Sequence, residues 1–437
     1  MKQKHIILAL FFYNTFSFSQ EVMNLKDCVN YALKNHASIS MAKNDLESAI
    51  ARKNEGRSAY LPQVNAQISW DDNIIKQATL MPAFPPLTTE PMKLEIGPTY
   101  NTIAGIQLDQ TLFNMSYIEG IRALKPNEEL NKLKLQKTEE DVIYNTVVAY
   151  YQLLVINENE KLLNESESRI KKTLPIVQLQ YEKGVARKID VDKITVNLNN
   201  ILANKEILRI NKDMAINNLK YTIGMPLSTE INIDTNYDKE ISANVSSEDN
   251  VKNRVELKLL NTSLTLNEIN YRRQKAAYYP TIALSAKYAG NSFGNNFSDS
   301  FSKWAQIAVV GVKITIPVFD GLRNASALKQ MSLSNENIKY NIKQTEDGLK
   351  LQLENAKTGI SNAVQNYTIN KENLELAKNI YDVTTLQYQK GVISYTDVLA
   401  ADFSYKEAEI NYLQSLVKYL NYKLELDRAN NNIQSYK

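Results

Sequence analysis

The feature that most constrains the fold is one segment that occurs twice, as LQYEKGVARKIDV at 179–191 and as LQYQKGVISYTDV at 386–398. In each copy a glycine, Gly184 or Gly391, follows a long run that has helical periodicity and no strand pattern. Glycine takes positive φ at little cost and is favoured just past the end of a helix. Each copy therefore predicts the tip of an antiparallel helical hairpin.

The composition favours very long helices over ordinary globular domains. The 437 residues include only 13 Gly and 11 Pro, and no proline follows Pro317. Both residue types interrupt helices, so their scarcity fits long uninterrupted helical segments. The formal net charge of +3 is close to neutral for this length and gives no indication of nucleic acid as a partner.

The first residues predict export. The chain begins with two lysines, the apolar run Ile6–Phe12 and the small-x-small triplet Ser17–Ser19. This pattern is typical of a signal peptide over residues 1–19, and the apolar run is too short for a membrane anchor. No later stretch is apolar enough for a transmembrane helix.

Four short runs alternate between apolar and polar residues, which predicts strands with one face of each kind. They lie at 64–70, 104–113, 282–288 and 310–316. The proline-rich stretch 71–100 predicts a long irregular loop. Helical periodicity covers the remaining segments, at 23–58, 117–183, 190–224, 250–277, 319–391 and 397–430. Pro126 and Pro175 predict kinks or short breaks in the longest of them.

The order of these elements recurs. One helix, two strands and a helical hairpin occupy 20–226, and the same series occupies 250–430. The sequence therefore predicts an internal two-fold repeat, with a connector at 227–249 and a tail at 431–437.

Four strands with one apolar face cannot stand alone in a membrane, because an open sheet edge is prohibitive there. Bacterial barrels have at least about eight strands. Two chains would supply eight strands around a filled interior, and three would supply twelve, enough for a pore. Stoichiometry thus favours a trimer if the protein transports.

The repeat, the strand pairs and the two GxxxxxDV tips resemble the TolC family of outer-membrane efflux proteins over essentially the whole mature chain. The resemblance implies a mixed membrane protein, in which long α-helices form a periplasmic α-barrel that continues a trimeric 12-stranded transmembrane β-barrel. It implies an exit duct of a tripartite efflux or type I secretion system in the outer membrane, extending into the periplasm. The implied partners are two further copies, outer-membrane lipid, a periplasmic adaptor, and through it an inner-membrane transporter of the RND, ABC or MFS type. The substrate is not specified.

The resemblance also assigns roles at the tips. In the family, acidic residues just after the second tip narrow the entrance and select cations. Asp397 occupies the matching position, whereas Ala400 replaces a second family acid. Asp190 and Asp192 are similar candidates at the first tip. The alternative is that Asp397 only completes a capping box with Ser394, three residues earlier.

The family closes its entrance with tyrosine–arginine contacts. Tyr388 matches the tyrosine, but Ile393 stands in place of the arginine, so a lock would have to use Arg187 or Lys188 from the other tip. Small and apolar residues at the tips are expected to contact the adaptor, although they would equally suit a tight turn. They are Gly184, Val185, Ala186, Gly391, Val392 and Ile393.

Enzymatic chemistry is not indicated. The mature chain keeps one histidine and one cysteine, too few for the usual zinc or catalytic-dyad site, and no cofactor is expected. An exported coiled-coil scaffold or adhesin would explain the helices but not the four strands. A periplasmic adaptor would have one hairpin rather than two. Aromatic residues near strand ends fit membrane-interface girdles, although strand ends are often aromatic. They are Tyr60, Trp70, Tyr100, Tyr278, Tyr279, Tyr288 and Trp304.

Overall fold

The computed structural model describes residues 22–83, 85–86, 90–234 and 250–437. They form two compact units: one contains the residues up to 43, 134–257 and 344–437, the other 44–133 and 258–343. The predicted signal peptide and most of the predicted connector lie outside the described residues.

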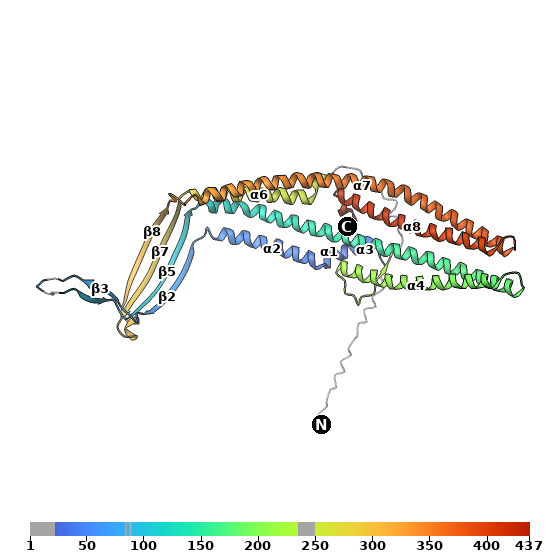
Figure 1. The fold of residues 1–437 in the computed structure, drawn as a ribbon. Coiled ribbons are helices and arrows are strands. Elements are labelled where there is room, and N and C mark those ends of the chain that lie inside the picture. Colours follow the sequence, from blue (N-terminus) through green and yellow to red (C-terminus); the bar gives the residue numbers. More distant parts are fainter. Residues whose placement is uncertain (1–21, 84, 87–89, 235–249) are drawn as a thin grey trace, which may run out of the picture. The chain divides into compact units, whose positions relative to one another are not determined.

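The unit that contains 44–133 and 258–343 holds an antiparallel four-stranded sheet (Figure 1). Its strands are β2 (Gln63–Asp72), β5 (Tyr100–Phe113), β7 (Thr281–Gly294) and β8 (Trp304–Thr315), in the order β2-β5-β7-β8. All four predicted strands are present, and β5, β7 and β8 extend further than the alternation indicated. Within the described residues, β2 and β8 are edge strands with a partner on one side only.

A second pair of strands lies where an irregular loop was expected. β3 (Gln77–Met81) and β4 (Met92–Ile96) form an antiparallel ribbon within the stretch 71–100. The loop prediction was wrong there because the prolines are confined to 82–91, between the two strands, and to Pro98. The strands themselves contain no proline and keep their backbone donors.

The helices match the predicted segments with two exceptions. The segment 23–58 is two helices, because His36 adopts an extended conformation (φ −68°, ψ 130°). Conversely, the longest helix continues without interruption through Pro126 and Pro175, so the expected breaks are absent. The helices are α1 (Leu25–Asn35), α2 (Ala37–Ser58), α3 (Met115–Glu182), α4 (Lys188–Ile223), α6 (Val255–Lys275), α7 (Arg323–Gln389) and α8 (Tyr395–Ala429).

Short elements complete the described chain. β1 (Val22–Met23) pairs in parallel with β6 (Asn232–Ile233). Four 3-10 helices are η1 (Val251–Asn253), η2 (Ala276–Tyr278), η3 (Ser298–Phe301) and η4 (Ile433–Tyr436). Ile433 and Tyr436 are buried, so the predicted C-terminal tail packs against the protein.

Two helical hairpins, α3/α4 and α7/α8, make up most of the other unit. α3 has 68 residues and α7 has 67, which at ~1.5 Å per residue gives each a length of about 100 Å. Buried residues recur at seven-residue intervals, as in coiled coils. These residues are Ile194, Ile201, Leu208 and Ala215 in α4, and Val398, Tyr405, Tyr412 and Tyr419 in α8. Among the described helices none is long and apolar enough to span a membrane.

Candidate functional site

The two faces of the four-stranded sheet differ in polarity. The strand register sets Val64 opposite Leu108, Leu108 opposite Ala286, and Ala286 opposite Val310, so one row of apolar side chains crosses all four strands. The same face carries Ala66, Ile68, Trp70, Ala104, Ile106, Leu284, Tyr288, Val312 and Ile314. The other face is mostly polar, with Gln63, Asn65, Gln67, Asn101, Gln107, Asp109, Ser285, Lys287, Asn291 and Lys313. Alternation of this kind is typical of barrel strands between lipid and an aqueous lumen.

The strand lengths suit a bilayer. β2, the shortest of the four, has 10 residues. At ~3.4 Å per residue and a tilt of ~40°, it covers about 26 Å along the membrane normal, close to the ~25 Å apolar band of outer-membrane barrels.

Aromatic rings cluster at the end of the sheet remote from the helix termini. Trp70 stacks on Tyr100 with ring centroids 5.6 Å apart, and Phe297 packs edge-on against both. Phe301 continues this cluster, 5.3 Å from Phe297. At the opposite end Tyr60 packs against Tyr117 at 4.8 Å. Of the predicted girdle residues, Tyr288 lies in the middle of its strand rather than at an end.

The two hairpin tips have the same backbone geometry. Gly184 and Gly391 both take φ of 75°, and no atom lies within 4 Å of a Cβ built on either glycine. The backbone N–H groups of Val185 and Val392 each reach back five residues, to the carbonyls of Gln180 and Gln387. The positive φ explains why glycine occurs at this position in both copies.

The two tips differ in whether the aspartate that follows the glycine is paired with a positive charge. Asp190 is buried, and the Arg187 guanidinium contacts it through Nε (3.1 Å to Oδ2) and Nη2 (3.2 Å to Oδ1). Asp397 is exposed, and it accepts hydrogen bonds from the backbone N–H (3.0 Å) and the hydroxyl (2.7 Å) of Ser394. Asp397 therefore keeps an uncompensated negative charge, and it also caps α8. Asp192 is exposed on α4.

Among the described residues no hydrogen bond joins Tyr388 to Arg187, although burial and the charge of Asp190 raise the pKa of the Tyr388 phenol. Arg187 is engaged by Asp190 within its own turn. This hydrogen-bonded carboxylate raises the pKa of the guanidinium. Tyr388 is buried against the Tyr395 ring at 5.5 Å, and its hydroxyl has no hydrogen-bond partner among the described residues. Val185 and Val392 are exposed at the tips, whereas Ala186 and Ile393 are partly buried against the hairpin core.

A buried ion pair joins the two hairpins away from the tips. Arg169 of α3 lies 15 residues before Gly184, which corresponds to about 22 Å along the helix. Its Nη2 lies 3.3 Å from Oε1 of Glu409 in α8 and donates to the Ser166 hydroxyl at 2.5 Å. Its guanidinium carbon lies 4.4 Å from the ring centroid of Tyr405 and 5.6 Å from that of Tyr381. We call Arg169, Glu409, Tyr405 and Tyr381 the hairpin latch.

Burial dominates the electrostatics of the latch. Glu409 is only 8% exposed, and its burial raises the pKa of the carboxyl more than Arg169 lowers it. Burial likewise raises the pKa of Tyr405 to about 12, so this phenol stays neutral. A buried ion pair is strongly destabilised when one partner is removed, because the other charge is then left without compensation.

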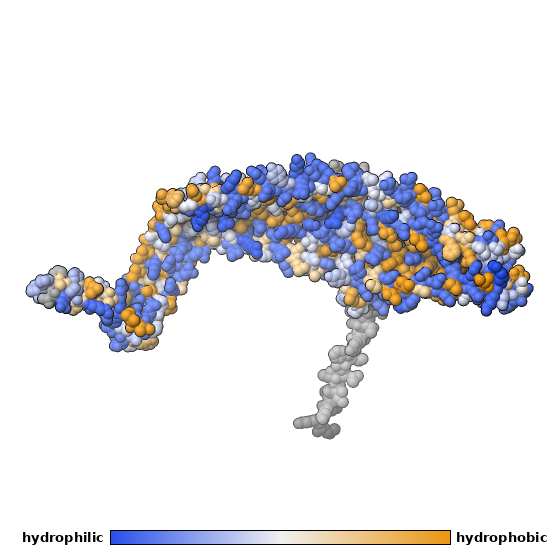
Figure 2. Space-filling model, in the orientation of Figure 1, coloured by the Kyte–Doolittle hydropathy of each residue, from blue (hydrophilic) through white to orange (hydrophobic). Residues whose placement is uncertain are grey.

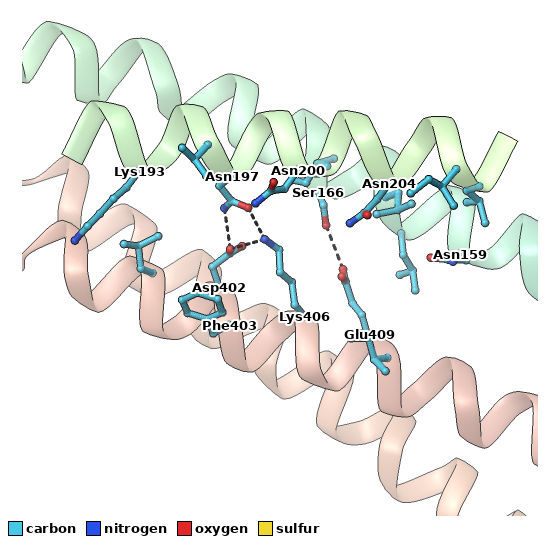
Figure 3. Close-up of a pocket in the computed structure, with 18 of the residues that line it drawn as sticks. Asn159, Ser166, Lys193, Asn197, Asn200, Asn204, Asp402, Phe403, Lys406 and Glu409 are labelled. Atoms are coloured by element: carbon cyan, nitrogen blue, oxygen red, sulfur yellow. Dashed lines mark hydrogen bonds and ion pairs between the residues drawn. The ribbon is translucent and has the colours of Figure 1, made fainter. Parts of the chain in front are cut away.

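A groove of about 920 Å³ opens between α4 and α8, with α3 as its floor (Figure 3). Asn197 of α4 donates to Asp402 of α8 at 2.9 Å, and Lys406 of α8 donates to Asn197 at 2.5 Å. Lys406 also pairs with Asp402 at 2.9 Å. The contacts of Asn197 with Asp402 and Lys406 cross the groove, so polar interactions join its two walls.

The rim of the groove is apolar and uncovered. Ile189, Val196 and Ile207 project from α4, and Phe403 and Ile410 from α8, each more than half exposed. Figure 2 shows apolar residues gathered over these two helices. Phe403, Ile410 and Val417 are spaced seven residues apart, the spacing of a coiled-coil seam. The apolar rim of the groove is therefore a surface on which a further helix can pack.

Sequence reasoning missed the latch and the groove. Carboxylates on helix faces are by default either solvated or paired with a neighbouring helix, and the sequence does not say which. Arg169 and Glu409 are 240 residues apart in the chain, so their pairing was not predicted. The available signal was the seven-residue recurrence of tyrosines in α8. Among the described residues, no group of three or more His, Cys, Asp or Glu side chains is placed to hold a metal ion.

Comparison with known proteins identifies the family. Residues 28–224 and 249–432 match the family described as outer membrane efflux protein. The chain is similar to the outer membrane protein TolC of Vibrio cholerae, with 19% identity over 93% of this chain and 90% of the relative. Its fold is similar to the CmeC outer membrane channel of Campylobacter jejuni (TM-score 0.73, 18% identity, 93% and 85% of the two chains).

A second solved structure, the outer membrane protein VceC of Vibrio cholerae, gives a TM-score of 0.74 at 15% identity, covering 93% of this chain and 95% of that one. The matched family is one of channels, not of enzymes. The two-faced sheet and the long hairpins agree with this assignment. The chain therefore belongs to the outer membrane efflux protein family, and it is an efflux channel of the outer membrane that extends into the periplasm.

Proposed function

We propose that the channel is a homotrimer in which three four-stranded sheets close into a 12-stranded transmembrane barrel. The observation that carries this proposal is a sheet with one apolar face and two open edges, β2 and β8. An open edge is prohibitive in lipid, so β2 of one copy pairs with β8 of the next. Three copies give a lumen wide enough to conduct, whereas two give a barrel filled by side chains.

The helices continue the duct into the periplasm. The series α2, β2, β5, α3, α4 is followed by α6, β7, β8, α7, α8, which supports an internal two-fold repeat. Each copy then contributes two equivalent columns to a tube of helices. The tube has no catalytic role, and substrates pass through it driven by the partner transporter.

Asp397 is the best candidate for a selectivity residue at the entrance. It is exposed and its charge is uncompensated, whereas Arg187 compensates Asp190. Three copies of Asp397 around a narrow opening would raise the local concentration of cations. Asp192, also exposed, takes a secondary place.

The groove between α4 and α8 and the exposed valines of the tips form the docking surface for a periplasmic adaptor. A helix of the adaptor fits the apolar seams on the rim, and the asparagines along the groove supply polar contacts. Through the adaptor the channel receives substrates from an inner-membrane transporter of the RND, ABC or MFS type.

The hairpin latch holds the entrance in its resting conformation. It takes the place of a tip lock, since Arg187 is bound within its own turn and Ile393 offers no charge. Separation of the hairpins would break the Arg169–Glu409 ion pair, so opening of the entrance requires other interactions that offset the lost pair.

The test is conductance of the purified protein in planar lipid bilayers, combined with its native mass. A trimer that gives discrete cation-selective steps supports the channel, and Asp397→Ala should lower the selectivity. A folded trimer without steps calls for the Arg169→Ala variant, which should open the entrance. If that variant is silent as well, or if the protein is a soluble monomer, a scaffold without a pore replaces the channel.

A further inference from the structure

The β3–β4 ribbon is amphipathic and has no cover within the described chain. All ten of its strand residues are exposed. The register places Met81 opposite Met92 and Thr79 opposite Leu94, and side chains two residues apart share a face. Met81, Met92, Leu94 and Ile96 therefore share one face with the uncharged Gln77 and Thr79, and this face carries no charge. The other face holds Ala78 and Leu80 together with the charged pair Lys93 and Glu95, 3.6 Å apart.

Such a ribbon needs a partner. A single two-stranded hairpin is marginally stable in water, and a hydrophobic face has to pack on something for the strands to persist. The corresponding connection between β7 and β8 shows the contrast. It is short, and its Phe297 and Phe301 are already packed into the aromatic cluster with Trp70 and Tyr100.

We propose that the apolar faces of β3–β4 ribbons from separate copies of this chain pack against one another at the outer end of the channel. The inference rests on the proposed trimer. The ribbon leaves the sheet beside β2, the edge strand that adjoins the neighbouring copy in a closed barrel. Between the end of β2 and the start of β5, Lys76 and Lys93 balance Glu90 and Glu95, so several copies meet without net repulsion.

The dimensions allow the contact. Twelve strands spaced ~4.8 Å apart and tilted by ~40° enclose a barrel of radius about 12 Å. Five paired residues at ~3.4 Å each make the ribbon about 17 Å long, enough to reach the barrel axis from the rim. Gly97, with φ of 123° and nothing within 4 Å of a built Cβ, gives the ribbon freedom to turn inward. Contact between the ribbons would narrow the exit.

The test is cross-linking of single-cysteine variants in the full-length protein, reconstituted in lipid vesicles, with a short bismaleimide. Leu94→Cys places a thiol on the apolar face, and Lys93→Cys places its matched control on the opposite face. Cys28 can stay because it is fully buried and its pKa is raised to about 12 by that burial. We expect covalent dimers from Leu94→Cys at ten times the yield from Lys93→Cys or more.

Each other outcome overturns the inference. Equal yields, or no cross-links from a protein of trimeric native mass, show that the ribbons do not meet. A fluorophore at Leu94→Cys that is quenched by brominated acyl chains in the vesicles assigns the face to lipid instead. A protein that is not trimeric removes the proposed function, which the native mass reveals separately.

A second readout addresses the exit. The triple variant Met92→Ser/Leu94→Ser/Ile96→Ser should raise single-channel conductance by about twofold or more, while Lys93→Ser/Glu95→Ser should leave it unchanged. If both variants conduct as the wild type does, the ribbons do not constrict the outer mouth.

Discussion

The two helical hairpins share one architecture but are built from different side chains. In the hydrophobic cluster near the tips, the buried residues that α3 and α4 contribute are all aliphatic, such as Ile170, Val177 and Ile194. The seam of α7/α8 is lined by tyrosines, with Tyr381 and Tyr405 stacked at 6.1 Å and Tyr388 against Tyr395 at 5.5 Å. Aliphatic side chains pack helices together and contain no polar atoms that need hydrogen bonds. Every buried phenol, in contrast, brings a hydroxyl that either finds a hydrogen-bond partner or remains unsatisfied.

The second hairpin therefore supplies the phenols that face Arg169 of the first hairpin. Tyr405 accepts a hydrogen bond from Arg169 at 3.4 Å, while the hydroxyl of Tyr381 is buried without a hydrogen-bond partner among the described residues. An incompletely satisfied seam has a smaller energy gap to alternative packings than an apolar one. We therefore expect α7/α8 to move when the channel opens and α3/α4 to stay closer to its resting form.

The largest effect should come from Arg169→Ala. It leaves Glu409 buried without its partner, which typically costs about 3–5 kcal/mol. Native-state hydrogen exchange should show a matching drop in the opening free energy of α7 and α8 near the latch, with a smaller change in α4. Equal loss in both hairpins would remove the proposed asymmetry. Ile194→Val, expected to cost only about 1 kcal/mol, is the control in the aliphatic seam.

The next largest difference between the two hairpins should be the effect of their tip charges on ion selectivity. Asp397→Asn removes an uncompensated charge, and we expect the cation-over-anion permeability ratio in planar bilayers to fall several-fold. The double variant Arg187→Gln/Asp190→Asn removes a compensated pair and keeps the net charge, so the ratio should stay within about twofold of wild type. If the double variant has the larger effect, the first tip is the one that selects.

The latch should also show a pH dependence of moderate size. The pKa of Glu409 is raised in the folded protein, so ionisation of this group opposes folding. Protonated Glu409 therefore stabilises the folded protein. This stabilisation is fully present below the ordinary pKa of 4.5 and is lost as the pH rises through the raised pKa of the folded protein. The opening free energy of α8 should fall over that window in the wild type. Glu409→Gln should abolish the dependence, and persistence of the slope would assign it to another group.

The smallest effects should come from single hydroxyl groups. Tyr381→Phe removes a hydroxyl without a partner and should change stability by less than about 0.5 kcal/mol, or increase it. Tyr405→Phe removes an acceptor of Arg169 and should cost about 0.5–1.5 kcal/mol. Thermal unfolding of the two variants beside the wild type measures both stability costs. Equal costs would mean that both phenols are hydrogen-bonded in solution.

The extent of sequence-based prediction varied between local and distant features. Alternation in 64–70 and 282–288 was sufficient for the strands, and Gly184 and Gly391 were sufficient for the tips, because those signals are local. The break at His36 is a tertiary effect: a Cβ on Gly224 would lie 3.0 Å from the His36 Cα, so the end of α4 packs closely there. The latch joins residues 240 positions apart, and only the fold reveals that they meet.

The open edges of the four-stranded sheet have a consequence for biogenesis. A newly exported single chain would present an apolar sheet face together with unpaired backbone groups along β2 and β8. Exposed edges of this kind recruit strands from any nearby chain, so a lone chain is prone to aggregate. Correct β2–β8 pairing between copies then competes kinetically with non-specific pairing to other chains. This competition depends on chain concentration. A periplasmic chaperone that covers the edges until the partner copies arrive would favour correct assembly.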